Sequence, residues 1–107
     1  TSWDLRRMAT GGLTLKPINS SDRKKLAIGQ DQMALRATHV GRYGNHARAM
    51  RAGIRKVDII IEFHGQTDLD SESRINEYAV QKKKPGDRVE IVYLRGKKRR
   101  TATIRLQ

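Results

Sequence analysis

The stretch HARAMRAGIRKVDII, residues 46–60, decides the fold of this 107-residue chain. Residues 46–52 predict a short helix, and Gly53 ends it because glycine readily takes the left-handed conformation that follows a helix. The residues that follow predict a strand over 57–63, in which side chains alternate between two faces. The predicted faces are Val57, Ile59, Ile61 and Phe63 on one side and Asp58, Ile60 and Glu62 on the other.

On the N-terminal side of this stretch, short elements alternate with turns. Gly11-Gly12 precedes a predicted strand over 13–15, which ends or lies at a sheet edge at Pro17 because proline has no N–H to donate. The run Asn-Ser-Ser-Asp at 19–22 offers capping side chains for a helix over 22–27. A second strand is predicted over 33–40.

On the C-terminal side, the pattern predicts a turn at 64–66 and a longer helix from Asp70 to about Lys83. Two strands, over 88–94 and 99–106, form a hairpin about the tight turn Gly96-Lys97. The connections are too short for parallel crossovers. We therefore expect an α+β fold with an antiparallel sheet and helices at its openings.

Several of these motifs, in this order, resemble the PDZ domain family. A small helix that ends in Ala-Gly-Ile at 52–54 and leads through Asp58 into an apolar strand resembles the PDZ signature, and Pro85-Gly86-Asp87 followed by Val92-Tyr93-Leu94 resembles its closing hairpin. The resemblance is closest to PDZ domains of extracytoplasmic bacterial proteases of the high-temperature-requirement type. It covers residues 11–107, and it leaves 1–10 as a linker or N-terminal extension.

The resemblance implies a PDZ-like, partly open antiparallel β-barrel of five or six strands with two helices. It further implies a non-catalytic module of a larger envelope protein, located in the periplasm or cell envelope, whose parent is a serine protease. The family has glycine before the aspartate where this chain has Val57. Because valine avoids the unusual dihedrals that glycine allows, we expect extended angles there and a different local turn.

The implied mechanism is addition of an extended peptide, or a protein C-terminus, as a strand beside residues 13–16. Backbone N–H groups near the two glycines would receive a terminal carboxylate, although the first apolar residue of the family's binding loop is missing. The resemblance fixes neither the ligand sequence nor the oligomeric state. The expected peptide-binding residues are Gly11, Gly12, Leu13, Thr14, Leu15, Ile75, Tyr78 and Ala79.

Each part of this site also has a plainer interpretation. Without the resemblance, the glycine pair is more typical of a flexible joint between a linker and a domain, whereas the resemblance favours the binding loop. An apolar helical stripe is usually core, so part of the set Ile75, Tyr78 and Ala79 is expected to be buried. A PDZ fold that only spaces other domains, with an empty groove, also fits the sequence.

The net charge of +12 raises a second function, that of a small basic nucleic-acid-binding protein. The charge is uneven: residues 41–56 carry five basic and no acidic side chains, whereas 57–81 carry one basic and six acidic ones. The most basic run, 95–100, lies at the predicted hairpin turn. Aromatic residues make up 5% of the chain and none interrupts this run, so we place nucleic-acid binding second to peptide binding.

Other classes find little support. The chain has no cysteine, which excludes disulfides and thiol chemistry. The longest apolar run is Ile59-Ile60-Ile61, far too short to insert into a membrane. The spacing of His64, Asp68 and Asp70 matches no common metal motif, and neither a nucleophile elbow nor a phosphate-binding loop is present. We therefore expect no catalytic residues, no metal and no cofactor in these residues.

Overall fold

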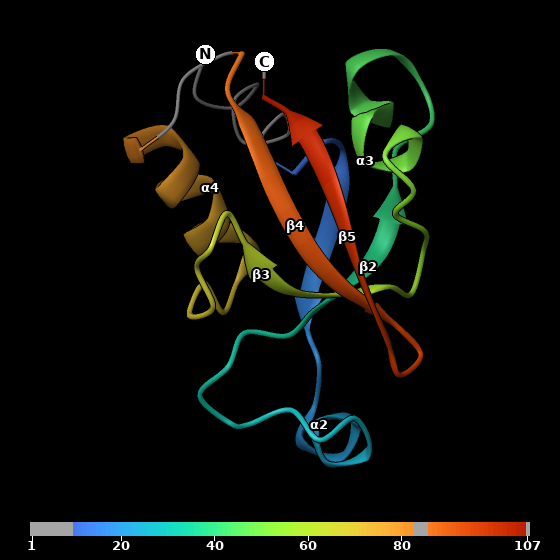
Figure 1. Cartoon of the computed structure of the whole chain (residues 1–107), viewed down its shortest axis with the longest axis vertical. Coiled ribbons are helices and arrows are strands. Elements are labelled where there is room, and N and C mark those ends of the chain that lie inside the picture. Colours follow the sequence, from blue (N-terminus) through green and yellow to red (C-terminus); the bar gives the residue numbers. More distant parts are fainter. Residues whose placement is uncertain (1–9, 83–85, 107) are drawn as a thin grey trace.

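The protein is built on one antiparallel sheet whose strands lie side by side in the order of the sequence (Figure 1). The computed structural model describes residues 10–82 and 86–106. Each strand pairs with the next through antiparallel hydrogen bonds. The five strands are β1 (Leu13–Pro17), β2 (Leu35–Val40), β3 (Ile59–Phe63), β4 (Arg88–Arg95) and β5 (Lys98–Arg105).

Short helices fill the connections between the strands. They are α2 (Ser20–Lys25), the 3-10 turn η1 (Gly44–Ala47), α3 (Arg48–Arg51) and α4 (Glu72–Lys82). Side-chain caps explain where two of them begin. The Asn19 Oδ1 atom accepts the backbone N–H of Asp22 at 2.8 Å, and the Ser71 hydroxyl accepts that of Arg74 at 3.2 Å.

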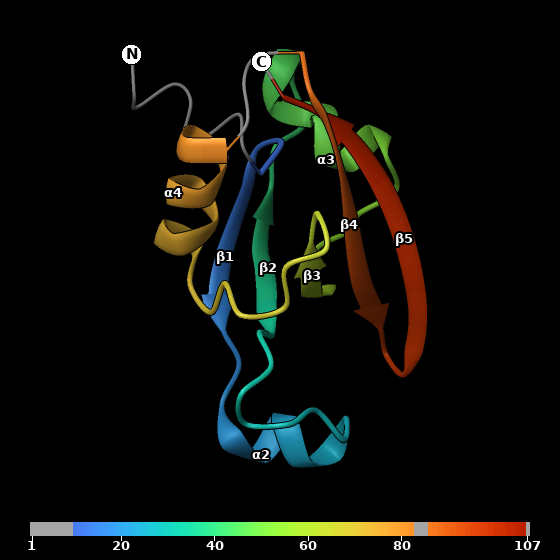
Figure 2. The same cartoon turned by 60° about the vertical axis from the view of Figure 1, so that its left-hand side comes forward.

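Both faces of the sheet bury apolar side chains. The larger cluster lies between the sheet and helices α3 and α4, and it includes Leu13, Leu15, Leu35, Ile75, Ile91 and Ile104. The smaller cluster occupies the opposite face, where the segment around α2 supplies apolar residues (Figure 2). It consists of Ile18, Ile28, Ala34, Ile59, Ile61 and Val92. Because β3 is buried on both faces, it begins with three isoleucines in succession, Ile59, Ile60 and Ile61.

The expected class is confirmed, since the described residues form an α+β fold with five antiparallel strands in an open sheet. They contain three α-helices rather than the two that the resemblance implied, because the short α2 is counted as well. The C-terminal hairpin turns where predicted, with Arg95 paired to Lys98 and Gly96 at a φ of +63°. No helix in residues 10–82 and 86–106 is long and apolar enough to cross a membrane.

The predicted faces of the third strand are wrong at its far end. Ile59 and Ile61 face the smaller cluster, but Phe63 packs with Ile60 in the larger one. The cause is a register shift between Ile60 and Glu62 in the pairing with β4. Such a bulge adds one residue to a strand, which reverses the alternation of faces beyond it.

The expectation of extended backbone angles at Val57 is also wrong. Val57 has a φ of +81°, in the left-handed region that suits glycine, so the turn keeps the shape for which the family uses glycine. Its N–H donates to the Ala37 carbonyl at 2.8 Å, which holds the turn against β2. A β-branched residue with this φ is strained, and the strain is tolerated because the surrounding hydrogen bonds fix the turn.

Candidate functional site

The edge of β1 is the outer edge of the described sheet on the side of α4 (Figure 2). Leu15 lies opposite Ala37 of β2. Both backbone groups of Ala37 bond to the β3 side, its N–H to the Asp58 carbonyl and its C=O to the Val57 N–H, each at 2.8 Å. Opposed residues of an antiparallel pair share both hydrogen bonds or neither. The N–H and C=O of Leu15 therefore point outward, toward the open edge.

A side chain of α4 occupies this edge. The carboxylate of Glu72, in the first turn of α4, lies near the Leu15 N–H. Burial raises the pKa of Glu72 above its ordinary value of 4.5, and the nearby Leu15 N–H lowers it by a smaller amount. An acceptor that is not part of the sheet therefore lies close to this donor.

The turn that leads into β1 brings together the two glycines singled out in the sequence. Gly11 and Gly12 have φ angles of +66° and +94°, and the Leu13 N–H closes the turn on the Thr10 carbonyl at 3.4 Å. That distance is long for an amide hydrogen bond, so this donor is only weakly engaged. Thr10, which the sequence analysis assigned to the linker, is buried, and its hydroxyl donates to the Leu13 carbonyl at 3.0 Å.

Gly11 is packed directly against α3, which explains why the apolar residue of the family pattern is missing. Its carbonyl accepts the Ala49 N–H at 3.1 Å. A Cβ atom at Gly11 would lie 2.8 Å from the Ala49 backbone nitrogen, closer than real Cβ contacts come. The tight approach leaves no room for a side chain, so this glycine is a structural part of the turn rather than a free joint.

The predicted residues of α4 have different surroundings. Ile75 and Ala79 are buried in the larger cluster together with Leu13 and Leu15 of β1. Tyr78 is partly buried, and its ring meets that of Phe63 edge-on with centroids 6.2 Å apart. Thr14 is exposed on β1. The structure thus brings the eight predicted residues to two facing elements and the turn between Thr10 and Leu13.

Sequence reasoning missed two polar residues of α4. Glu72 was not among the residues that the sequence analysis expected in the site. Asn76 follows it by one turn on the same face, and it is buried with no hydrogen-bond partner for its Oδ1 atom in the part of the chain that the structure describes. A polar residue within an apolar helical stripe was the available signal. Glu72 lies beside Leu15 of β1, whereas the Asn76 Oδ1 atom is enclosed within the fold.

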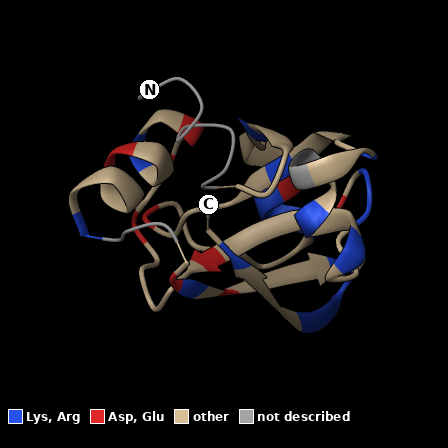
Figure 3. Cartoon of the chain, turned by 90° about the horizontal axis from the view of Figure 1, so that it is seen from above, with Lys and Arg blue, Asp and Glu red and all other residues tan. Residues whose placement is uncertain are grey.

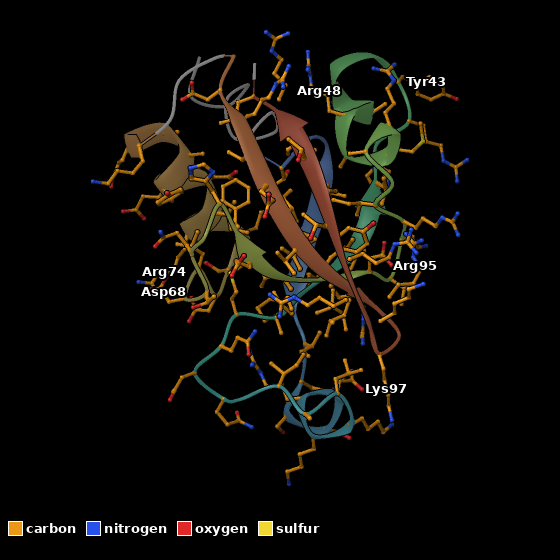
Figure 4. The ribbon with its side chains drawn as sticks, in the orientation of Figure 1. Tyr43, Arg48, Asp68, Arg74, Arg95 and Lys97 are labelled. Atoms are coloured by element: carbon orange, nitrogen blue, oxygen red, sulfur yellow. The ribbon has the colours of Figure 1, made fainter. Side chains whose placement is uncertain are left out.

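The other features weighed in the sequence have structural roles or remain isolated. Asp58 is buried in an ion pair with Arg95. Among the described residues, no group of three or more histidine or acidic side chains lies close enough to hold a metal ion. The exposed side chains of 97–100 extend along the β4–β5 hairpin, with Lys97 at its tip (Figure 4).

This arrangement defines a class of protein: a small α+β module with a partly covered sheet edge beside a helix. The sequence profile of the PDZ domain family matches residues 45–106, more than half of the chain. The chain therefore belongs to the PDZ family, a class of binding modules rather than of catalytic domains. No curated protein sequence is significantly similar to it.

Solved structures share the fold at low sequence identity. The HtrA-type protease AlgW S227A with a decapeptide is 24% identical, with a TM-score of 0.73 over 90% of this chain. The HtrA3 PDZ domain bound to a phage-derived ligand (FGRWV) is 22% identical, with a TM-score of 0.62; the match covers 90% of this chain and 83% of that one. The PDZ domain of EpsC from Vibrio cholerae is 11% identical, with a TM-score of 0.56 and coverage of 91% and 97%. This chain spans only 27% of the length of the AlgW chain.

Proposed function

We propose that this PDZ domain binds an extended peptide, which adds as a further strand to the open edge of β1 opposite α4. The observation that carries the proposal is that the N–H and C=O of Leu15 point outward at the open edge of β1, beside the Glu72 carboxylate. An outward backbone donor at a sheet edge is the group to which a peptide carbonyl binds in strand addition. Glu72 takes the place that such a carbonyl would occupy.

The turn before β1 suits the end of the peptide. Two glycines with positive φ expose backbone N–H groups to an anion, and the Leu13 amide is held only by a long hydrogen bond. A terminal carboxylate there would gain charge-assisted hydrogen bonds. We therefore infer that the ligand is a chain end, with its last residues running along β1.

The proposed peptide contacts combine the sequence prediction with the geometry. Main-chain contacts come from the turn and β1, and side-chain contacts come from the face of α4 that is turned toward β1. The proposed residues are Gly11, Gly12, Leu13, Thr14, Leu15, Ile75, Tyr78 and Ala79.

Similar structures support this inference by what they contain. AlgW is described with a decapeptide and with a tripeptide, and the HtrA3 PDZ domain with the ligand FGRWV. On the same grounds we propose that the domain belongs to a longer bacterial protein of the periplasm or cell envelope, with a serine protease as its attached enzyme. Neither the net charge nor the basic hairpin supplies a specific contact that would favour nucleic acid as the ligand.

The test measures two affinities of the 107-residue chain at about 150 mM salt, where charges are screened beyond roughly 8 Å. The ligands are a peptide with an apolar C-terminal residue and a random-sequence DNA oligomer. A variant with Lys97, Lys98, Arg99 and Arg100 replaced by serine serves as the comparison. We expect its peptide affinity to stay within about 0.5 kcal/mol of the wild type, because surface changes away from a site have small effects. Micromolar DNA binding by the wild type that the variant loses would overturn the proposal.

A further inference from the structure

A hollow lies where β2 ends near α3. In Figure 1, β2 and α3 lie on the opposite side of the molecule from α4. The volume of the hollow, about 500 Å³, falls within the range of roughly 300–1,000 Å³ of ligand pockets. We call it the α3 hollow. It is lined by Thr38, His39, Val40, Arg42, Met50, Ile54, Arg55 and Lys56.

The α3 hollow is electropositive because three cationic side chains and no acidic ones line it. The cations are Arg42, Arg55 and Lys56, and all three are exposed. The acid nearest in sequence, Asp58, is buried and bound to Arg95 at 2.9 and 3.1 Å, so it does not neutralise these cations. Figure 3 shows that basic residues gather on the side away from α4, whereas acidic residues are concentrated near α4.

The hollow and its rim also expose apolar surface. Val40 lines it from β2 and is partly buried, Ile54 lines it but is only 1% exposed, and Met50 of α3 is 39% exposed. Tyr43 and Val57, each next to a lining cation in sequence, are 84% and 61% exposed, and Tyr43 projects outward beside α3 (Figure 4). Exposed apolar groups gathered beside charges are typical of interaction surfaces, whereas scattered ones are not.

We propose that the α3 hollow is a second binding site, which takes an acidic polypeptide segment that carries one apolar side chain. The apolar side chain fills the space between Val40, Met50 and Ile54, and flanking carboxylates pair with the surrounding cations. A nucleic acid fits the lining less well, because a phosphate backbone has no apolar group for that space. Base stacking along a strand needs successive aromatic platforms, and Tyr43 is the one strongly exposed aromatic side chain among the described residues.

The experiment titrates the 107-residue chain with the labelled peptide fluorescein-Asp-Asp-Glu-Phe-Glu-Asp-Asp-amide at about 150 mM salt. Its amidated end disfavours binding at the β1 edge. The test variant carries Arg42→Glu with Lys56→Glu, and the matched control carries Lys97→Glu with Lys98→Glu, which changes the net charge equally. All four side chains are exposed, and the melting temperature of each variant verifies folding.

We expect saturable binding by the wild type, a loss of about tenfold or more in the Arg42 and Lys56 variant, and a change within about twofold in the hairpin control. Met50→Ser should weaken binding severalfold, because it removes apolar contact. An unlabelled peptide that binds the β1 edge should not compete. Replacing the acidic residues of the labelled peptide by asparagine and glutamine should abolish binding.

Three results would overturn the proposal. Equal losses in the two charge-reversal variants would show a response to net charge alone. Competition by the β1-edge peptide would place the acidic peptide in the first site. Tighter binding of a DNA oligomer than of the acidic peptide, lost with Arg42→Glu and Lys56→Glu, would make this surface a nucleic-acid site.

Discussion

The guanidinium of Arg95 donates two hydrogen bonds to the buried carboxylate of Asp58, from Nη2 at 2.9 Å to one oxygen and from Nε at 3.1 Å to the other. Arg95 is the last residue of β4 and is labelled in Figure 4. Asp58 directly precedes β3, so the pair ties the end of β4 to the loop that leads into β3. Nη2 also donates to the Gly53 carbonyl at 2.8 Å, and the Asp58 carboxylate accepts the Arg55 N–H at 2.8 Å. The hydrogen bond to the Asp58 carboxylate raises the pKa of Arg95 above its ordinary value. This network of hydrogen bonds holds the loop between α3 and β3, which lies within the stretch 46–60, in place.

Asp58→Asn should destabilise the domain by about 2 kcal/mol, since hydrogen bonds to a charged group contribute roughly 1.5–3 kcal/mol. Urea unfolding followed by circular dichroism measures this. Asp70→Asn is the control, because Asp70 pairs with Arg74 at 3.2 Å in an exposed i,i+4 contact that is worth about 0.5 kcal/mol or less. Equal effects of the two substitutions would contradict the structural role of Asp58.

Val57→Gly should stabilise the domain, by about 1 kcal/mol. Val57 is exposed and has a φ of +81°, so the substitution relieves backbone strain and loses little buried surface. The greater freedom of glycine in the unfolded chain offsets part of the gain. The measurement is the midpoint of thermal unfolding, with Val80→Gly of α4 as a control that should lower it. A lower midpoint for Val57→Gly than for the wild type would show that the backbone at Val57 is not strained.

Gly11→Ala should weaken both folding and peptide binding. The added methyl group would approach the Ala49 nitrogen to 2.8 Å in a turn with a φ of +66°. Gly44→Ala is a matched control, since Gly44 has a φ of +58° and open space around its Cβ position. Both variants incur the left-handed penalty of about 1–2 kcal/mol, but only Gly11→Ala has the clash. We expect peptide affinity to fall in Gly11→Ala alone, as measured by calorimetry.

Glu72 should make stability depend on pH in a way that Glu72→Gln removes. Burial raises the pKa of Glu72 in the folded state above 4.5, so its neutral form is favoured by folding. Its contribution to stability is therefore fully present below about pH 4.5 and is lost as the pH rises through the folded-state pKa. Relative to Glu72→Gln, the wild type should be more stable at pH 4 than at pH 7. A difference that does not change with pH, in urea unfolding at both values, would contradict this.

Peptide affinity should rise when Glu72 is removed, because a peptide must displace its carboxylate from the Leu15 N–H. We expect Glu72→Ala to bind an apolar-ended peptide about three- to tenfold more tightly at pH 7, the scale of one net hydrogen bond. Glu77→Ala, on the exposed side of α4, should leave affinity unchanged. Weaker binding by Glu72→Ala would mean that the carboxylate contacts the peptide instead of competing with it.

Local patterns predicted most of the fold. The C-terminal hairpin was predicted about the turn Gly96-Lys97, and the structure pairs β4 with β5 there. The register shift in β3 escaped the sequence, because a bulge depends on pairing with β4 rather than on the residues of β3 alone. The left-handed Val57 also escaped, because tertiary hydrogen bonds overrode the preference of a β-branched residue.

The candidate site was only partly predictable. The glycine pair and the strand after it were found from their local pattern, but the close approach of Gly11 to Ala49 joins segments far apart in sequence. Apolar periodicity pointed to Ile75 and Ala79, which are core residues of the larger cluster. Glu72 was missed as a site residue because its contact with Leu15 depends on the distance between α4 and β1, which sequence patterns do not encode.

The most direct test of the central claim is an NMR titration of the ¹⁵N-labelled chain with a peptide that ends in an apolar residue and a free carboxylate. The account predicts that amide signals of residues 12–16 shift together with those of α4. It also predicts that amidation of the peptide end weakens binding by about 1–3 kcal/mol, the cost of leaving donors without their charged partner. Shifts confined to the basic hairpin at 95–100, with none at residues 12–16, would contradict it.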